Sequence, residues 1–174
     1  MFAEACAAAA AMIILVMGMS GAGKTTVGRL LASRLGWEFI DGDDHHPEAN
    51  VNKMRSGIPL TDADRAPWLE SLRALMVSRT AAGKNAVVAC SALKQAYRET
   101  LRLVPDVYFV YLKGTASLLR ERLRDRVGHF MSPAMLESQL AVLEEPADSL
   151  VIDVAQSPDE IVMEILVGLG SSKP

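Results

Sequence analysis

The sequence predicts an α/β fold with a parallel sheet in one domain, and two observations lead to this prediction. Short apolar runs alternate along the chain with longer segments in which apolar residues recur at helical spacing. A glycine-rich segment also lies directly between one such run and one such helical segment, as in a βα unit. We therefore expect strands and helices to alternate, with the strands side by side in parallel.

Apolar runs mark the expected strands. MIILVM (12–17) contains no charged residue, which indicates a central strand buried on both faces. Together with this run, the later ones predict a five-stranded sheet: WEFI (37–40), AVVAC (86–90), VYFVYL (107–112) and SLVIDV (149–154).

Capping signals mark the expected helices between the strands. Thr61 precedes Asp64 in a capping-box arrangement and opens a long helix. Ser157 and Glu160 open the last helix in the same way. Further helices are expected at 24–35, over a segment that carries Lys94, Tyr97 and Arg98, and over TASLLRERLRDR (115–126).

Composition narrows the class of protein. The chain has 174 residues, of which 50% are hydrophobic and 22% charged, as in an ordinary globular domain. The formal net charge of −3 gives no general attraction to nucleic acid or to an anionic membrane, so neither partner is expected. Cys90 ends an apolar run and is expected to be buried. We expect residues 12–174 to form one domain.

The N-terminal segment MFAEACAAAAAMIILVMG resembles a signal peptide only superficially. It lacks a basic beginning, and Glu4 interrupts it. We therefore expect residues 1–11 to be an N-terminal extension of a cytoplasmic protein. Whether the functional start is Met1 or Met12 stays open.

GMSGAGKT (18–25) is the strongest motif, because it fits G-x-x-x-x-G-K-[ST] at every position. The glycines let the loop turn its backbone N–H groups toward phosphate oxygens, and the next helix adds the positive end of its dipole. We expect Lys24 to reach the β- and γ-phosphates as a catalytic residue, and the Thr25 hydroxyl to ligate Mg²⁺. This P-loop predicts binding of a nucleoside triphosphate. The residues expected to hold it are Gly18, Met19, Ser20, Gly21, Ala22, Gly23, Lys24, Thr25 and Thr26.

Other motifs separate the classes of P-loop protein. A GTPase would carry N-K-x-D, but NKMR (52–55) lacks the aspartate. A motor or transporter ATPase would carry a Walker-B aspartate, but the third and fourth runs lead into Cys90-Ser91 and Lys113-Gly114. A small chain with one P-loop and without these motifs indicates a kinase for a small acceptor.

FIDGDDHHP (39–47) follows the second predicted strand. Ligands collect at the carboxyl ends of parallel strands, so Asp41 and Asp43 are expected beside the γ-phosphate. One carboxylate can hold the water shell of the metal while the other accepts the proton of an attacking hydroxyl. We assign Asp43 as the catalytic base and Asp41 to the Mg²⁺ side, and the reverse assignment stays open. A zinc site is not expected at His45 and His46, because no further ligand lies at zinc spacing.

Several polar residues could surround the acceptor. His45 or His46, of which we assign His46, either hydrogen-bonds in the acceptor pocket or belongs to a polar turn before a helix. Five scattered cations would suit an acceptor with a carboxylate, although each could also be a solvated surface charge. These are Arg55, Arg65, Lys94, Arg98 and His129. In the arginine-rich segment that follows the fourth run, we assign Arg122 and Arg126 to a lid that neutralises the transferring phosphoryl group.

Motifs along nearly the whole chain, from about Met12 to Gly168, resemble those of the gluconokinase family of small P-loop carbohydrate kinases. They are GMSGAGKTT, DGDDHHPEANVNKMRSGIPLTDADRAPWL, ACSALKQAYRETLR, VYLKG, GHFM and LEEP, in this order. The resemblance implies ATP-dependent phosphorylation of D-gluconate at its 6-hydroxyl, to give 6-phospho-D-gluconate in gluconate catabolism. It also implies a core similar to shikimate and adenylate kinases, with strand order 2-3-1-4-5, a lid, and a homodimer. By the same resemblance, adenine is expected near 155–158.

Two alternatives compete with this reading. One is a related kinase for shikimate or another sugar acid, but shikimate kinases lack the DDHHP and SALK…YR blocks. The other is a non-catalytic nucleotide-binding protein, which would need neither Asp43 nor a cationic acceptor pocket.

Overall fold

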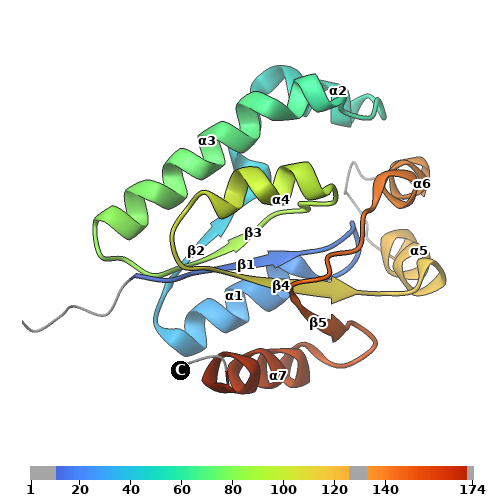
Figure 1. Cartoon of the computed structure of the whole chain (residues 1–174). Helices are drawn as coiled ribbons and strands as arrows, with labels where there is room; N and C mark the ends of the chain where they lie inside the picture. Colours follow the sequence, from blue (N-terminus) through green and yellow to red (C-terminus); the bar gives the residue numbers. More distant parts are fainter. Residues whose placement is uncertain (1–10, 126–132, 172–174) are drawn as a thin grey trace, which may run out of the picture.

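The computed structural model describes residues 11–125 and 133–171. A five-stranded parallel sheet has the order β2-β3-β1-β4-β5, which confirms the predicted fold class (Figure 1). Its strands are β1 (Ile13–Met17), β2 (Glu38–Asp41), β3 (Ala86–Ala89), β4 (Val107–Lys113) and β5 (Leu150–Asp153).

Helices cover both faces of the sheet. The helices are α1 (Lys24–Leu35), α2 (Glu48–Arg55), α3 (Asp62–Ala81), α4 (Gln95–Arg102), α5 (Ala116–Arg124), α6 (Pro133–Val142) and α7 (Pro158–Ser171), with a short 3₁₀ turn η1 (Gly42–His45). Figure 1 shows α3 and α4 over one face, α1 and α7 over the other, and α5 and α6 near the carboxyl ends of the strands. None of the helices in 11–125 and 133–171 has the length and apolarity that a membrane crossing requires.

β1 divides the hydrophobic core in two. Its side chains alternate between the faces of the sheet, as in any strand. Ile14 and Val16 join a core with α1, α5, α6 and α7, which we call the α1-side core. Ile13, Leu15 and Met17 join a core with α3 and α4, the α3-side core. All five residues of β1 are buried, which confirms its predicted central place.

The predicted capping boxes are present. Thr61 Oγ1 accepts the N–H of Asp64 at 3.2 Å, and the Asp64 carboxylate accepts the N–H of Thr61 at 2.8 Å. Hydrogen bonds from Lys53 and Thr61 lower the pKa of Asp64 to about 2. Ser157 and Glu160 make the same reciprocal pair at the start of α7. The sequence pattern therefore places these helix starts correctly.

The strand bounds differ from the predicted runs by one residue. The strand predicted at 37–40 has both bounds wrong by one residue, since β2 is Glu38–Asp41. The N–H of Trp37 donates instead to Ala32 O at 2.9 Å and closes the end of α1. Asp41 pairs with Ala89 of β3, so the strand carries this aspartate to the edge of the sheet. Cys90, which follows β3, is fully buried, which confirms the prediction. Burial raises the pKa of its thiol to about 12.

Candidate functional site

The P-loop joins β1 to α1 in a conformation that only glycine adopts easily. Gly18, Gly21 and Gly23 have φ values of 147°, 85° and 88°. At Gly18 a Cβ would also lie 2.7 Å from Leu112 O, so the loop passes β4 too closely for a side chain. Lys24 folds back over the loop, and its ammonium donates to Met19 O at 3.1 Å. Backbone N–H groups and this ammonium make a positive cradle for phosphate oxygens.

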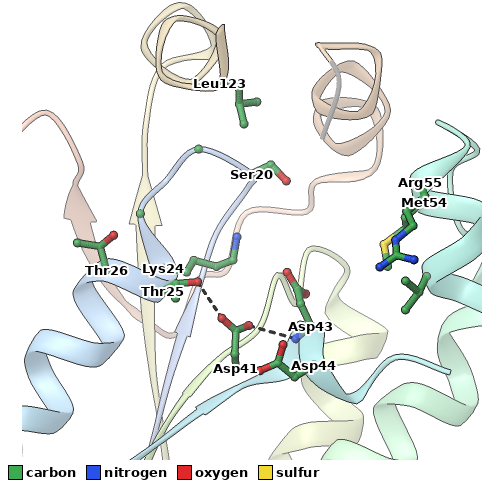
Figure 2. A pocket seen from close by; sticks show the side chains of 13 residues that line it. Ser20, Lys24, Thr25, Thr26, Asp41, Asp43, Asp44, Met54, Arg55 and Leu123 are labelled. Carbon is green, nitrogen blue, oxygen red and sulfur yellow. Dashed lines mark hydrogen bonds between the residues drawn. The ribbon is translucent and has the colours of Figure 1, made fainter. Parts of the chain in front are cut away.

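A cavity of about 580 Å³ opens beside this cradle (Figure 2). It brings together predicted nucleotide residues from the P-loop and the start of α1 with predicted acceptor-side residues from β2, η1 and α2. Its lining includes Ser20, Gly21, Gly23, Lys24, Thr25, Thr26, Asp41, Asp43, Asp44, Met54 and Arg55. Figure 2 shows Arg55 across the cavity from Lys24.

The two aspartates of the β2 segment are held differently. Asp41 Oδ2 accepts the Thr25 hydroxyl at 2.9 Å, and Asp41 Oδ1 accepts the N–H of Asp43 at 3.2 Å (Figure 2). The side chain of Asp43 is 58% exposed and faces the cavity. Asp41 is therefore bonded to Thr25 at the end of the P-loop, whereas Asp43 belongs to the η1 turn that follows and has a largely exposed carboxylate.

A stacked pair lies behind Asp43. The ring of His46 stacks on the indole of Trp68, with centroids 4.1 Å apart and an angle of 16° between the planes. Trp68 Nε1 donates to Gly42 O at 2.8 Å, and His46 Nε2 lies 4.0 Å from Asp43 Oδ1. This packing fixes the η1 turn on α3 and thereby the place of Asp43.

Known proteins resemble the chain along most of its length. A family model described as "AAA domain" matches residues 13–146. A gluconokinase of Gluconobacter oxydans is 48% identical, over 88% of this chain and 88% of that protein. The crystal structure of a gluconokinase from Sinorhizobium meliloti superposes with a TM-score of 0.83 at 45% identity, over 93% of each chain. The chain belongs to the gluconokinase family.

More distant structures share only the fold of this gluconokinase-family chain. A shikimate kinase from Acinetobacter baumannii has a TM-score of 0.62 and 23% identity, over 94% of this chain and 95% of the other. The shared fold agrees with the predicted similarity of the core.

Among the residues that the structure describes, the predicted acceptor cations do not form one cluster. Arg65 Nη1 donates to Leu60 O at 2.6 Å and lies 3.4 Å from the Tyr97 hydroxyl. Lys94 pairs with the Asp62 carboxylate at 2.7 Å, and the Tyr97 hydroxyl also donates to Asp62. These residues gather where α3 and α4 begin, while Arg55 lines the main cavity.

Arg98 is buried and bonds backbone carbonyl groups in this structure. It is 3% exposed, and its Nη1 donates to Ala92 O and Leu93 O, both at 3.0 Å. Burial lowers the pKa of its guanidinium. The contacts in this structure therefore stabilise the turn between β3 and α4, and a direct contact with the acceptor stays a prediction.

The lid residues are only partly described. Arg126 and His129 lie outside the described residues. Arg122 Nη2 donates to Val154 O at 2.7 Å and lines a second cavity of about 320 Å³. Gln156 and Pro158 line the same cavity, which adjoins the outer side of the P-loop at Thr26. This location agrees with the adenine position that the family resemblance implies, and that position stays a prediction.

Three residues near the site escaped the sequence reading. Trp68 looked like a core residue of a helix, and its indole N–H partner could not be foreseen. Gln139 lies outside the quoted motifs, and Glu144 lies in the LEEP block, which has no assigned role, yet Gln139 bonds the P-loop and Glu144 bonds the start of α4. The one signal for Gln139 is general: a side-chain amide that is buried requires hydrogen-bond partners.

Gly42 should be intolerant of any side chain. A Cβ there would lie 2.6 Å from Ala89 O, a backbone atom of β3 that cannot move aside easily. We expect Gly42→Ala to lower the free energy of unfolding by about 1–3 kcal/mol, because the η1 turn must shift. Urea unfolding measures this loss. Gly170→Ala on α7 is the control, since its Cβ would meet nothing within 4 Å, and an equal loss there would contradict the explanation.

Stability should depend on pH through His46. Burial, with a smaller effect of Arg65, lowers the pKa of His46 from 6.5 to about 4. Between these values the unfolded chain binds more protons, so the free energy of unfolding falls as the pH falls through this window. We expect His46→Gln to remove up to about 3 kcal/mol of this pH dependence. Urea unfolding from neutral to acid pH tests it, and an unchanged slope in the variant would refute it.

Proposed function

We propose that this protein transfers the γ-phosphoryl group of ATP to the 6-hydroxyl of D-gluconate, giving 6-phospho-D-gluconate and ADP. The observation that carries the proposal is the P-loop and Asp43 around one cavity, in a chain of the gluconokinase family. Membership of this family makes the protein an ATP-dependent carbohydrate kinase.

Asp43 is the proposed base of the transfer. Its carboxylate accepts the proton of the 6-hydroxyl while that oxygen forms a bond to the γ-phosphorus. The bond from this phosphorus to the β,γ-bridging oxygen breaks, and ADP leaves. Lys24 and the N–H groups of the P-loop stabilise the negative charge that moves onto the leaving oxygen. The Thr25 bond to Asp41 favours this assignment over the reverse one, because it keeps Asp41 on the phosphate side.

The donor set at the P-loop fits Mg²⁺. The Thr25 hydroxyl and the Asp41 carboxylate are hard oxygen donors that already lie 2.9 Å apart beside the phosphate cradle. Thr25 and Asp41 would hold the ion, which when bound would supply positive charge that neutralises part of the phosphate charge. In the described part of the chain, no group of three or more acidic, His or Cys residues makes a separate metal site.

The acceptor side supplies polar and cationic groups for a hydroxylated carboxylate. Arg55 in the cavity and Arg65 near Tyr97 are the proposed partners of the carboxylate, with Lys94, Arg98 and His129 as further candidates. His46 is neutral at physiological pH because its pKa is lowered to about 4, so it would act by hydrogen bonding and by holding the turn.

Three further parts of the proposal rest on the sequence, except for the homodimer, which rests on the family resemblance. The protein works in the cytoplasm, it forms a homodimer, and residues 12–174 are one domain with Arg122 and Arg126 on its lid side. Light scattering behind size-exclusion chromatography tests the dimer. A chain that starts at Met12 should keep full turnover if the extension takes no part.

A single assay tests the reaction. ADP release is measured from MgATP with D-gluconate, shikimate, other sugar acids, or no acceptor. We expect release only with gluconate or close analogues. Release that ignores gluconate, or no release with it, would overturn the proposal, and a preference for shikimate would favour the alternative kinase.

A further inference from the structure

Ser20 of the P-loop is hydrogen-bonded to Gln139, a residue far along the chain. The N–H of Ser20 donates to Gln139 Oε1 at 2.8 Å, and Gln139 Nε2 donates to the Ser20 hydroxyl at 3.0 Å. Both residues are only 8% exposed, so water does not replace these bonds easily. Two bonds in opposite directions fix both the position and the orientation of Ser20.

The grip is anchored by the packing of α6, which carries Gln139. Leu136 of this helix is fully buried in the α1-side core, together with Leu119 and Leu123 of α5. Gly21, the neighbour of Ser20, passes so close to α5 that a Cβ would lie 3.0 Å from Leu119 O. The P-loop is thus held between α5 and α6, with Gln139 as the polar contact.

The segment that follows α6 bonds the other side of the site. The N–H of Glu144 donates to Leu93 O at 2.9 Å, and its carboxylate accepts the N–H of Gln95 at 2.6 Å. Gln95 is the first residue of α4, so the carboxylate also lies at the positive end of that helix. Lys94, a proposed acceptor residue, lies between the two anchored positions.

The two loops follow the paired strands β1 and β3, where the N–H of Cys90 donates to Val16 O at 3.1 Å, and beyond the strands their described direct contact is weak. The N–H of Gly18 donates to Ser91 O at 3.4 Å, which is long for such a bond. The link through residues 139–144 uses four shorter bonds. It therefore adds to the β1–β3 pairing a second connection that restrains the spacing between the P-loop and the turn before α4.

We propose that Gln139 and Glu144 are positioning residues of phosphoryl transfer, through which residues 139–144 hold the P-loop and the turn before α4 at a fixed spacing. The inference rests on the proposed function, since it assigns the P-loop to ATP and the turn to the acceptor. Small displacements of either group matter because in-line transfer requires reacting atoms within a narrow range of distances.

The first test compares Gln139→Ala with wild type. Loss of both bonds frees Ser20, and we expect kcat/KM for ATP to fall about tenfold. Gln139→Glu keeps an acceptor for the N–H of Ser20 and should recover part of the loss. The matched control is Glu137→Ala on the same helix, which loses only its exposed pair with Arg120 and should match wild type.

The second test uses Glu144→Ala, which leaves the N–H of Gln95 without this acceptor. We expect KM for gluconate to rise about fivefold to tenfold, with KM for ATP much less affected. Glu145→Ala is the control, because Glu145 pairs with Lys113 on the surface and bonds neither loop.

A purely structural role predicts a different pattern. It would lower the melting temperature of Gln139→Ala and Glu144→Ala, yet leave kcat and both KM values at wild-type levels well below that temperature. That result would overturn the inference. If Gln139→Ala does not fold, Ser20→Ala removes one of the two bonds, and it must then raise KM for ATP while Glu137→Ala does not.

Failure of the proposed function gives a separate signal. If wild type binds ATP but does not phosphorylate gluconate, the proposed function falls, and the acceptor half of this inference falls with it. The nucleotide half is then decided by titration with ADP. Weaker ADP binding by Gln139→Ala supports the grip on the P-loop, and equal binding overturns it.

Discussion

Asp43→Asn is expected to lower kcat for gluconate phosphorylation by about 10²–10⁴-fold, the contribution of a well-placed general base. The amide keeps the size of the carboxylate but cannot take the proton of the attacking hydroxyl. ATP affinity should change little, since the carboxylate that accepts the Thr25 hydroxyl beside the phosphate cradle is that of Asp41. Steady-state ADP release and an ATP titration measure the two effects.

Asp44→Asn is the matched control for this change. Asp44 also lines the cavity and lies in the same η1 turn, so the variant removes one negative charge from nearly the same place. We expect kcat of Asp44→Asn to stay within the same order of magnitude as that of the wild type. Near-normal rates in Asp43→Asn would remove Asp43 from the role of base and point to Asp41, the assignment that stayed open.

Lys24→Met should be the second most damaging change. The thioether keeps most of the side-chain length but removes the ammonium that faces the phosphate cradle. A preorganised charge of this kind contributes about 10²–10³-fold to phosphoryl transfer, so kcat should fall by that factor. KM for ATP should rise as well, because the ammonium contacts the ground-state phosphates too.

Lys84→Met serves as the control for Lys24→Met. Lys84 is exposed and precedes β3, at the end of the sheet opposite the P-loop. It should leave kcat and KM unchanged. If Lys24→Met kept wild-type turnover, the P-loop of this chain would not serve phosphoryl transfer at all.

Features encoded by neighbouring residues could be predicted from the sequence. The P-loop is set by glycines and Lys24 within one short segment, and the helix at Thr61 by a side chain three residues away. The order of the strands followed from family resemblance. For the P-loop and the helix at Thr61, local geometry leaves the chain few other choices.

Contacts between distant segments could not be predicted in the same way. The Ser20–Gln139 bonds join residues 119 positions apart, and no sequence pattern around either residue indicates that they are in contact. Arg98 shows the same limit, because a guanidinium suits a carboxylate ligand and backbone carbonyls equally well. Lys94 likewise has an exposed partner, Asp62, that only the packing of α3 against α4 reveals.

The division of the core by β1 has a consequence for how such an enzyme can diversify. Trp68, which backs the turn of Asp43, belongs to the α3-side core, while Val27 and Leu119, beside the P-loop, belong to the α1-side core. Substitutions on one side of the central strand can therefore accumulate with little strain on the other. An ancestral kinase could exchange one acceptor for another by remodelling α2, α3 and α4, and keep its phosphate donor machinery intact throughout.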